Sequence, residues 1–98
     1  MAENIYRYDI YIGGDNGSSA ITDEYLDKIV EWANESFPDG YTMTLGRGYW
    51  HGKREDCVVL NALTEDEDAV VKRLRKLKGE LKQDSILLSR YAVEAETV

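Results

Sequence analysis

The residues best suited to chemistry or ligand recognition lie close together in the sequence, between positions 47 and 54. Three permanent cations, a histidine and two large aromatic residues gather there: Arg47, Tyr49, Trp50, His51, Lys53 and Arg54. Guanidinium groups bind phosphate or carboxylate through paired hydrogen bonds, and aromatic rings stack on bases or fill a partner's pocket. We therefore expect a site for a small anionic ligand, with a nucleotide as the most specific version, or for a protein partner.

A structural interpretation of the same stretch stays open. Gly52 predicts a hairpin turn, while Gly46 and Gly48 predict a bulge or a close backbone approach in the strand before it. The aromatic rings would then pack at the end of a sheet, and the cations would keep the turn soluble. Glu55 and Asp56 would neutralise part of the positive charge.

A second candidate site is the glycine-rich stretch at residues 13–19, which contains Asp15 and Asn16. It lies between a predicted strand and a predicted helix, where backbone N–H groups can bind anions. It has neither the lysine of a phosphate-binding P-loop nor the glycine spacing of a dinucleotide fingerprint. Asp15 itself would oppose an anion, and turns favour Asx and Gly for backbone reasons alone.

His51 and Cys57 are the only residues of their kinds, which limits catalytic and metal chemistry. A general base needs an orienting partner, and only Glu55 and Asp56 are near His51 in sequence. A structural zinc site needs about four ligands, which one cysteine and one histidine cannot supply. Cys57 lies in an apolar run and is expected to be a buried, inert thiol. We expect no catalytic residue, metal or cofactor.

Length and charge exclude other classes of function. Ninety-eight residues fit one domain, residues 1–98, with an ordered core of about 4–95. The net charge is −7, and it comes from residues 1–46, since residues 47–98 contain equal numbers of acids and bases. An acidic chain repels phosphate backbones, so general nucleic-acid binding is not expected. We expect neither a signal peptide nor a membrane span, and cysteine poverty favours the cytoplasm.

Hydrophobic periodicity predicts the order strand, helix, strand, strand, helix, strand. Alternation marks strands at 5–12, 41–50, 56–63 and 85–95. Thr22 is the predicted N-cap of the first helix, with an apolar stripe of Leu26, Ile29, Val30, Ala33 and Phe37. A capping box of Thr64 and Glu67 precedes the second helix, whose core face is Val70, Leu74, Leu77 and Leu81. Right-handed crossovers predict a ferredoxin-like βαββαβ α+β fold, spatial order 4-1-3-2, with both helices on one face of an antiparallel sheet.

The other face of that sheet is predicted to stay open. It would carry both apolar and polar residues: Ile5, Arg7, Asp9, Tyr11, Thr42, Thr44 and Trp50. An RNA-recognition domain uses this face but needs a basic-glycine-aromatic motif in its third strand, and residues 56–63 have none. The mixed face instead indicates contact between subunits, so we expect a homo-oligomer, a dimer or a trimer.

Three patches of the chain resemble a group of small uncharacterised phage and prophage proteins. The matching positions are Gly14, Asp15, Asn16, Gly48, Tyr49, Trp50, Gly52, Glu55, Glu80, Leu81 and Gln83. The resemblance implies a viral origin and a host cytoplasm, and it brings no known activity. The strand-hairpin region is also similar to the PII/CutA class of ferredoxin-like trimers, which implies binding of small ligands, often nucleotides, between subunits.

The leading hypothesis is therefore a non-enzymatic, oligomeric binding protein that contacts a small anion or a host protein through the hairpin. One alternative is a structural or protein-interaction module without a small ligand. Another is a small enzyme that uses His51.

Overall fold

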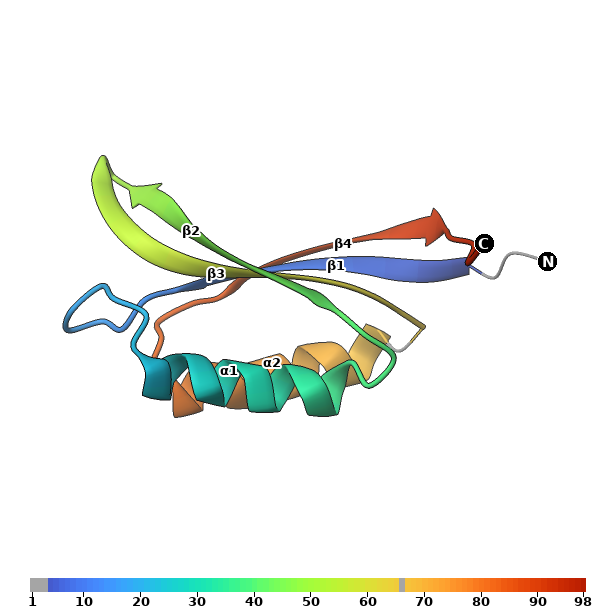
Figure 1. The fold of residues 1–98 in the computed structure, drawn as a ribbon, viewed down its shortest axis with the longest axis horizontal. Coiled ribbons are helices and arrows are strands. Elements are labelled where there is room, and N and C mark those ends of the chain that lie inside the picture. The colour runs from blue at the N-terminus through green and yellow to red at the C-terminus, as the bar shows by residue number, and fades with distance from the viewer. Residues whose placement is uncertain (1–3, 66) are drawn as a thin grey trace.

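The computed structural model describes residues 4–65 and 67–98 of the chain. Its elements are β1 (Asn4–Gly13), α1 (Asp23–Ser36), β2 (Thr42–Trp50), β3 (Lys53–Thr64), α2 (Glu67–Glu80) and β4 (Leu87–Glu94). Both helices lie against one face of a single four-stranded sheet, and no described helix covers the opposite face, here called the open face (Figure 1). The predicted ferredoxin-like α+β fold is confirmed.

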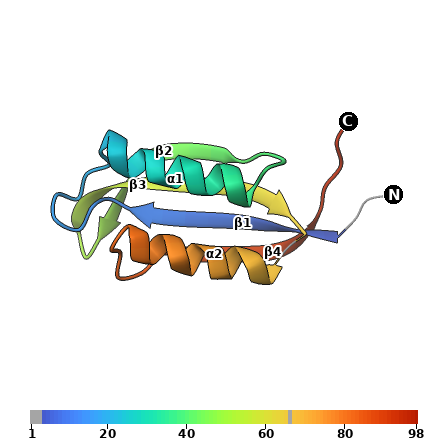
Figure 2. The ribbon, with the colours of Figure 1, turned by 90° about the horizontal axis from the view of Figure 1, so that it is seen from below.

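The strands are ordered β2-β3-β1-β4 and every neighbouring pair is antiparallel. This is the predicted order 4-1-3-2, read from the other edge. Seen from the helix side, α1 and α2 run side by side beneath the sheet (Figure 2). None of the helices in the described ranges is long and apolar enough to cross a membrane.

The core lies between the helices and the covered face of the sheet. Tyr8, Ile10 and Ile12 alternate along β1 and are fully buried, as their period of two requires. Strand β3 and helix α2, with the residue that follows the helix, add Val58, Leu60, Ala62, Val70, Leu74, Leu77 and Leu81 to the core. The predicted core face of α2 is therefore confirmed, and each large apolar side chain buried there stabilises the fold by roughly 1.5–3 kcal/mol.

Helix α1 begins as predicted, and three residues of its predicted stripe, Ile29, Ala33 and Phe37, are buried in the core. The Thr22 hydroxyl accepts a hydrogen bond from the Tyr25 amide at 3.2 Å, which confirms the N-cap. The buried helical residues are Tyr25, Ile29, Trp32, Ala33 and Ser36, whereas Leu26 and Val30 are only half-buried. The prediction missed Tyr25 and Trp32, which bury their rings and still satisfy their polar ends, as amphipathic aromatics can.

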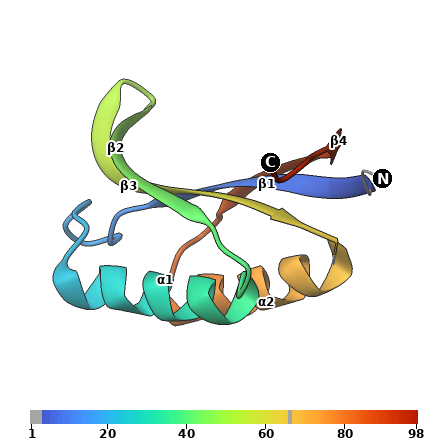
Figure 3. The same ribbon diagram turned by 45° about the vertical axis from the view of Figure 1, so that its right-hand side comes forward.

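The hairpin of β2 and β3 extends beyond the helices (Figure 1) and curls away from them (Figure 3). Its pairing continues without interruption to Trp50↔Lys53, so the predicted bulge at Gly46 and Gly48 is wrong. The two turn residues both have positive φ, 52° at His51 and 77° at Gly52. That pattern is a type I′ turn, which matches the right-handed twist of the strands.

Element boundaries differ modestly from those predicted. Strand β3 begins at Lys53 rather than 56, because its pairing with β2 holds all the way to the turn. Strand β4 spans Leu87–Glu94 rather than 85–95. The predicted capping box depends on the side chain of Glu67, which lies outside the described part of the chain.

Candidate functional site

The strand register divides the predicted hairpin site between two faces. Arg47 pairs with Asp56, and Tyr49 pairs with Arg54. These four residues lie on the same face of the sheet as the two helices. Trp50 pairs with Lys53 on the open-face side. Alternation of side chains across a strand makes this division unavoidable. The structure therefore brings Arg47, Tyr49 and Arg54 together and places Trp50 and Lys53 behind them.

The helix-facing side of the hairpin encloses a hollow of about 350 Å³. The two arginines Arg47 and Arg54 line it, together with the apolar side chains of Ile21 and Leu45. Asp56 is the one acidic residue in its lining. We call this feature the hairpin hollow. Two cations against one carboxylate leave it positive in a chain whose net charge is −7.

The Arg54 guanidinium is only loosely engaged. Its Nη2 lies 4.0 Å from Asp56 Oδ1, and both side chains are about half exposed. An exposed pair at this distance contributes little, about 0–1 kcal/mol, because solvent screens it. Arg54 is therefore free to turn toward an anionic group entering the hollow.

The second predicted site, Asp15 and Asn16, belongs to a closed loop between β1 and α1. The Asp15 carboxylate accepts hydrogen bonds from the backbone amides of Gly17, at 2.8 Å, and Ser18, at 3.3 Å. Asn16 Nδ2 donates to the carbonyl of Lys82 at 2.5 Å, just beyond the end of α2. Both side chains thus hold the loop in place, and a ligand would have to displace these bonds.

The same loop is fastened to the base of the hairpin. The Gly14 amide donates to Asp56 O at 2.9 Å, and the Asp56 amide donates to Ser19 O at 3.2 Å. Tyr25 Oη, from α1, donates to Gly13 O at 2.6 Å. Burial, followed by the charges of Asp15 and Glu55, raises the pKa of Tyr25 to about 12, so its proton stays in place at neutral pH.

His51 stands at the exposed tip of the hairpin. Its ring packs edge-on against Trp50, with centroids 4.8 Å apart, and Trp50 is 73% exposed. Within residues 4–65 and 67–98, no carboxylate forms a hydrogen bond or ion pair with His51. The Glu55 side chain lies instead over Gly13, where a Cβ would collide with it. The arrangement expected for a His51 general base is therefore not assembled in this chain alone.

Cys57 is only half-buried, which corrects the prediction of a buried thiol. Burial, and then the negative charges of Glu55 and Asp56, raise the pKa of its thiol. The thiol therefore stays protonated and weakly nucleophilic at neutral pH. The described ranges contain no cluster of three or more residues able to hold a metal ion.

A polar cluster on the open face was not anticipated from the sequence as a unit. Asp9 is only 8% exposed although no helix covers it. Its Oδ1 accepts hydrogen bonds from Asn61 Nδ2, at 2.7 Å, and Arg7 Nε, at 3.1 Å, and its Oδ2 accepts one from Tyr91 Oη, at 3.4 Å. Burial alone would raise the pKa of Asp9, but these hydrogen bonds and the Arg7 charge outweigh it and lower the pKa.

Two signals in the sequence could have revealed this cluster. Asp9 interrupts a strand of aromatic and β-branched residues, and Asn61 interrupts the apolar run of the third strand. Asp9 and Asn61 lie opposite each other because of the register between β1 and β3. Arg7 and Tyr91 lie opposite each other because of the register between β1 and β4. Local sequence does not specify register directly.

Large apolar side chains surround the polar cluster. Tyr11, Leu63, Leu87 and Tyr91 are 41–65% exposed on the same open face. Exposed apolar side chains gathered in this way beside polar groups are typical of protein contact surfaces.

No protein-family model matches the chain, and no curated protein matches its sequence. The chain is similar in structure to a nitrogen regulatory PII-like protein from Thiomonas intermedia, solved with ADP, AMP and bicarbonate, with a TM-score of 0.68 and 11% identity over 100% of this chain and 99% of that one. It is also similar to a DUF3240 family protein from Shewanella baltica, with a TM-score of 0.63 and 12% identity over 95% and 94% of the two chains.

A third similar structure is a phage SAM lyase in complex with S-methyl-5′-thioadenosine. Its TM-score is 0.56 at 16% identity, over 93% of this chain and 90% of the lyase chain. At such identities these likenesses show the fold alone. They confirm the resemblance to PII-like proteins at that level, whereas the resemblance to the group of small phage proteins stays a prediction. This βαββαβ fold is thus one that binds small ligands in other proteins.

Proposed function

We propose that this protein is a non-enzymatic binding protein for a small anion, and that the hairpin hollow is its binding site. The observation that carries the proposal is the convergence of Arg47 and Arg54 on one hollow with an apolar wall. Two guanidinium groups can hold a phosphate or carboxylate by paired hydrogen bonds, while Ile21 and Leu45 exclude water from one side.

A nucleotide is the most specific form of the proposed ligand. Tyr49 lies on the same face as the arginines, directly opposite Arg54, and is 69% exposed. Its ring can stack on a base while Arg54 contacts the phosphate, because the two side chains are cross-strand neighbours. The ADP and AMP of the PII-like protein and the S-methyl-5′-thioadenosine of the lyase have an adenosine-like portion in common, which guides the choice of compounds to test.

A thermal-shift panel of AMP, ADP, ATP, S-methyl-5′-thioadenosine and bicarbonate tests the proposal. A ligand at about 100 times its Kd stabilises the native state by about 2.7 kcal/mol. For a domain of this size that corresponds to a rise in Tm of roughly 10 °C or more. If no compound at millimolar concentration raises the Tm, the small-ligand proposal fails. The alternative, a structural or protein-interaction module without a small ligand, would then explain the protein better.

We further propose that a second copy of the chain covers the open face. Tyr11, Leu87 and Tyr91 are large and exposed there, and covering them would add the apolar burial that the single chain lacks. Sedimentation at high micromolar concentration should show a dimer or a trimer. Tyr11→Ala combined with Leu87→Ala should dissociate it, whereas Tyr49→Ala, on the other side of the sheet, should not. A monomeric wild-type protein would contradict this assembly.

An enzyme acting on SAM (S-adenosylmethionine) is the second candidate, and the observation in its favour is the likeness to the phage SAM lyase. Incubation with SAM followed by chromatography would reveal turnover. The variants His51→Gln and Glu55→Gln would then test whether residues of the hairpin are needed for this turnover. Turnover lost in either variant would replace the binding proposal with a catalytic one.

A further inference from the structure

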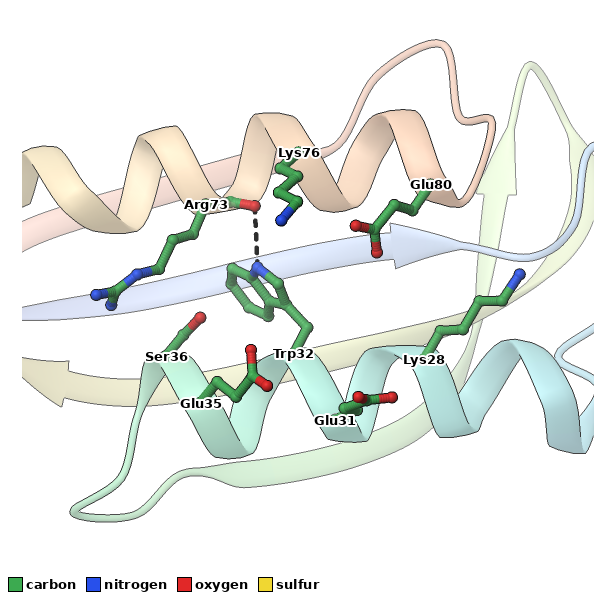
Figure 4. Close-up of a pocket in the computed structure, with 8 residues that line it drawn as sticks. All are labelled: Lys28, Glu31, Trp32, Glu35, Ser36, Arg73, Lys76 and Glu80. Atoms are coloured by element: carbon green, nitrogen blue, oxygen red, sulfur yellow. Dashed lines mark hydrogen bonds between the residues drawn. The ribbon is translucent and has the colours of Figure 1, made fainter.

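The two helices line a second cavity, to which the hairpin contributes none of the lining residues. This cleft of about 540 Å³ runs between α1 and α2 on the surface opposite to the open face (Figure 4). Its volume is within the roughly 300–1,000 Å³ of small-molecule sites. Six charged residues line it, three cations and three acids: Lys28, Arg73, Lys76, Glu31, Glu35 and Glu80.

The wall of the cleft is a tryptophan that cannot easily move. Trp32 Nε1 donates a hydrogen bond to the carbonyl of Arg73 at 2.9 Å, which ties α1 to α2. The Phe37 ring packs edge-on against it, with centroids 5.7 Å apart. Because the indole is held from two sides, it offers a rigid apolar surface to anything that enters the cleft.

Ser36 adds an unused hydrogen-bonding group at one end. It is 6% exposed, and its hydroxyl has no hydrogen-bond partner within the described ranges. A buried hydroxyl without a partner is unfavourable, and native structures usually supply one. Figure 4 shows this hydroxyl directed toward α2, on the side where the Arg73 side chain extends.

The charges around the cleft are balanced but do not pair with one another. No two of these six residues form an ion pair within 4.0 Å. A ligand with one sign of charge would meet as many repulsive groups as attractive ones. A zwitterion can satisfy both sets at once.

We propose that the α1–α2 cleft binds a free α-amino acid. Its carboxylate would accept hydrogen bonds from the Arg73 guanidinium and the Ser36 hydroxyl, which supplies the partner that Ser36 lacks. Its ammonium group would lie beside the Glu35 carboxylate, one residue earlier on α1 and directed into the same end of the cleft (Figure 4). The side chain would extend along Trp32 toward Lys76 and Glu80.

Tryptophan fluorescence tests this site without interference from the hairpin. The full chain carrying Trp50→Phe keeps Trp32 as its only tryptophan. Titration with each of the twenty amino acids should give a saturable change in Trp32 emission for at least one. Arg73→Gln should weaken that binding about ten- to a hundredfold, as expected for loss of a charge-assisted hydrogen bond. Ser36→Ala should weaken it by a smaller factor.

Two controls separate this site from other effects. Arg75→Gln, on the same helix but outside the lining of the cleft, should leave amino-acid binding unchanged. Arg47→Ala, in the hairpin hollow, should also leave it unchanged, so that failure here does not affect the proposed nucleotide site. The proposal is overturned if no amino acid at 10 mM gives a saturable response, or if Arg73→Gln and Ser36→Ala both bind as tightly as the parent.

Discussion

Strands β2 and β3 have different roles in two regions of the molecule. One region is the part of the sheet that the helices cover, and the other is the hairpin that projects beyond them. Near the helices, β3 contributes Val58 and Leu60, which are fully buried. In the hairpin, the positions of β3 on the same face are Asp56 and Arg54. Their partners on β2, Arg47 and Tyr49, are exposed. The fold is thus stabilised in one half, while the residues proposed for binding lie in the other. Substitutions should therefore separate stability from ligand affinity.

The largest effect on stability is expected in the covered half. Ile29 is fully buried beneath the sheet, so Ile29→Ala should lower the free energy of unfolding by about 2–5 kcal/mol through lost burial and a cavity. Urea denaturation measures the loss. Val30→Ala, at a half-buried neighbour, should cost clearly less. A loss below about 0.5 kcal/mol for Ile29→Ala would mean that the core is misassigned.

A smaller effect is expected at the polar cluster on the open face. Asp9→Asn keeps the shape but removes the charge that Arg7, Asn61 and Tyr91 stabilise, and should cost about 1.5–3 kcal/mol at pH 7. Asp39→Asn, at an exposed carboxyl, is the matched control.

The same variant predicts a pH dependence. The pKa of Asp9 in the fold lies below its usual value of 3.8, so its contribution is complete above that pH and is lost as the pH falls further, through the folded pKa. The difference in stability between wild type and Asp9→Asn should therefore shrink in acid. A difference that stays constant down to pH 2 would mean that the pKa of Asp9 is not lowered.

Tyr25 connects the two halves and should show an intermediate effect. Tyr25→Phe removes the hydrogen bond to Gly13 O and should cost about 0.5–1.5 kcal/mol. The pKa of Tyr25 is about 12 in the fold against 10 in an unfolded chain, so the neutral phenol stabilises the native state. This contribution is complete below pH 10 and is lost as the pH rises through 12. Wild type and variant should therefore converge in stability above pH 10, and parallel curves would contradict the assignment.

The covered half was the more predictable one, for a physical reason. Burial imposes a period of two on strands and of 3.6 on helices, so the element order, the sheet order and the core face of α2 follow from spacing. On α1, Tyr25 and Trp32 were missed because they bury polar atoms that find distant partners, Gly13 O and Arg73 O. Such partners depend on tertiary packing, which spacing does not describe.

The candidate site was predictable only as a set of residue types. The sequence places Arg47, Lys53 and Arg54 within one hairpin, but one residue of register decides which face each side chain takes. Alternation separates Lys53 from Arg54, but only the register of β2 with β3 shows that Arg47 and Arg54 share a face. The α1–α2 cleft was missed because its charged residues are also those of an ordinary solvated helix face.

The most direct test of the hairpin hollow compares two neighbouring cations on opposite faces of one strand. Calorimetric titration with the nucleotide that gives the largest thermal shift should show binding weakened about ten- to a hundredfold by Arg54→Ala. Lys53→Ala should bind as wild type does, and both variants should unfold within about 0.5 kcal/mol of it. Equal losses of affinity in the two variants, or no loss in either, would contradict a binding site on the helix-facing side of the hairpin.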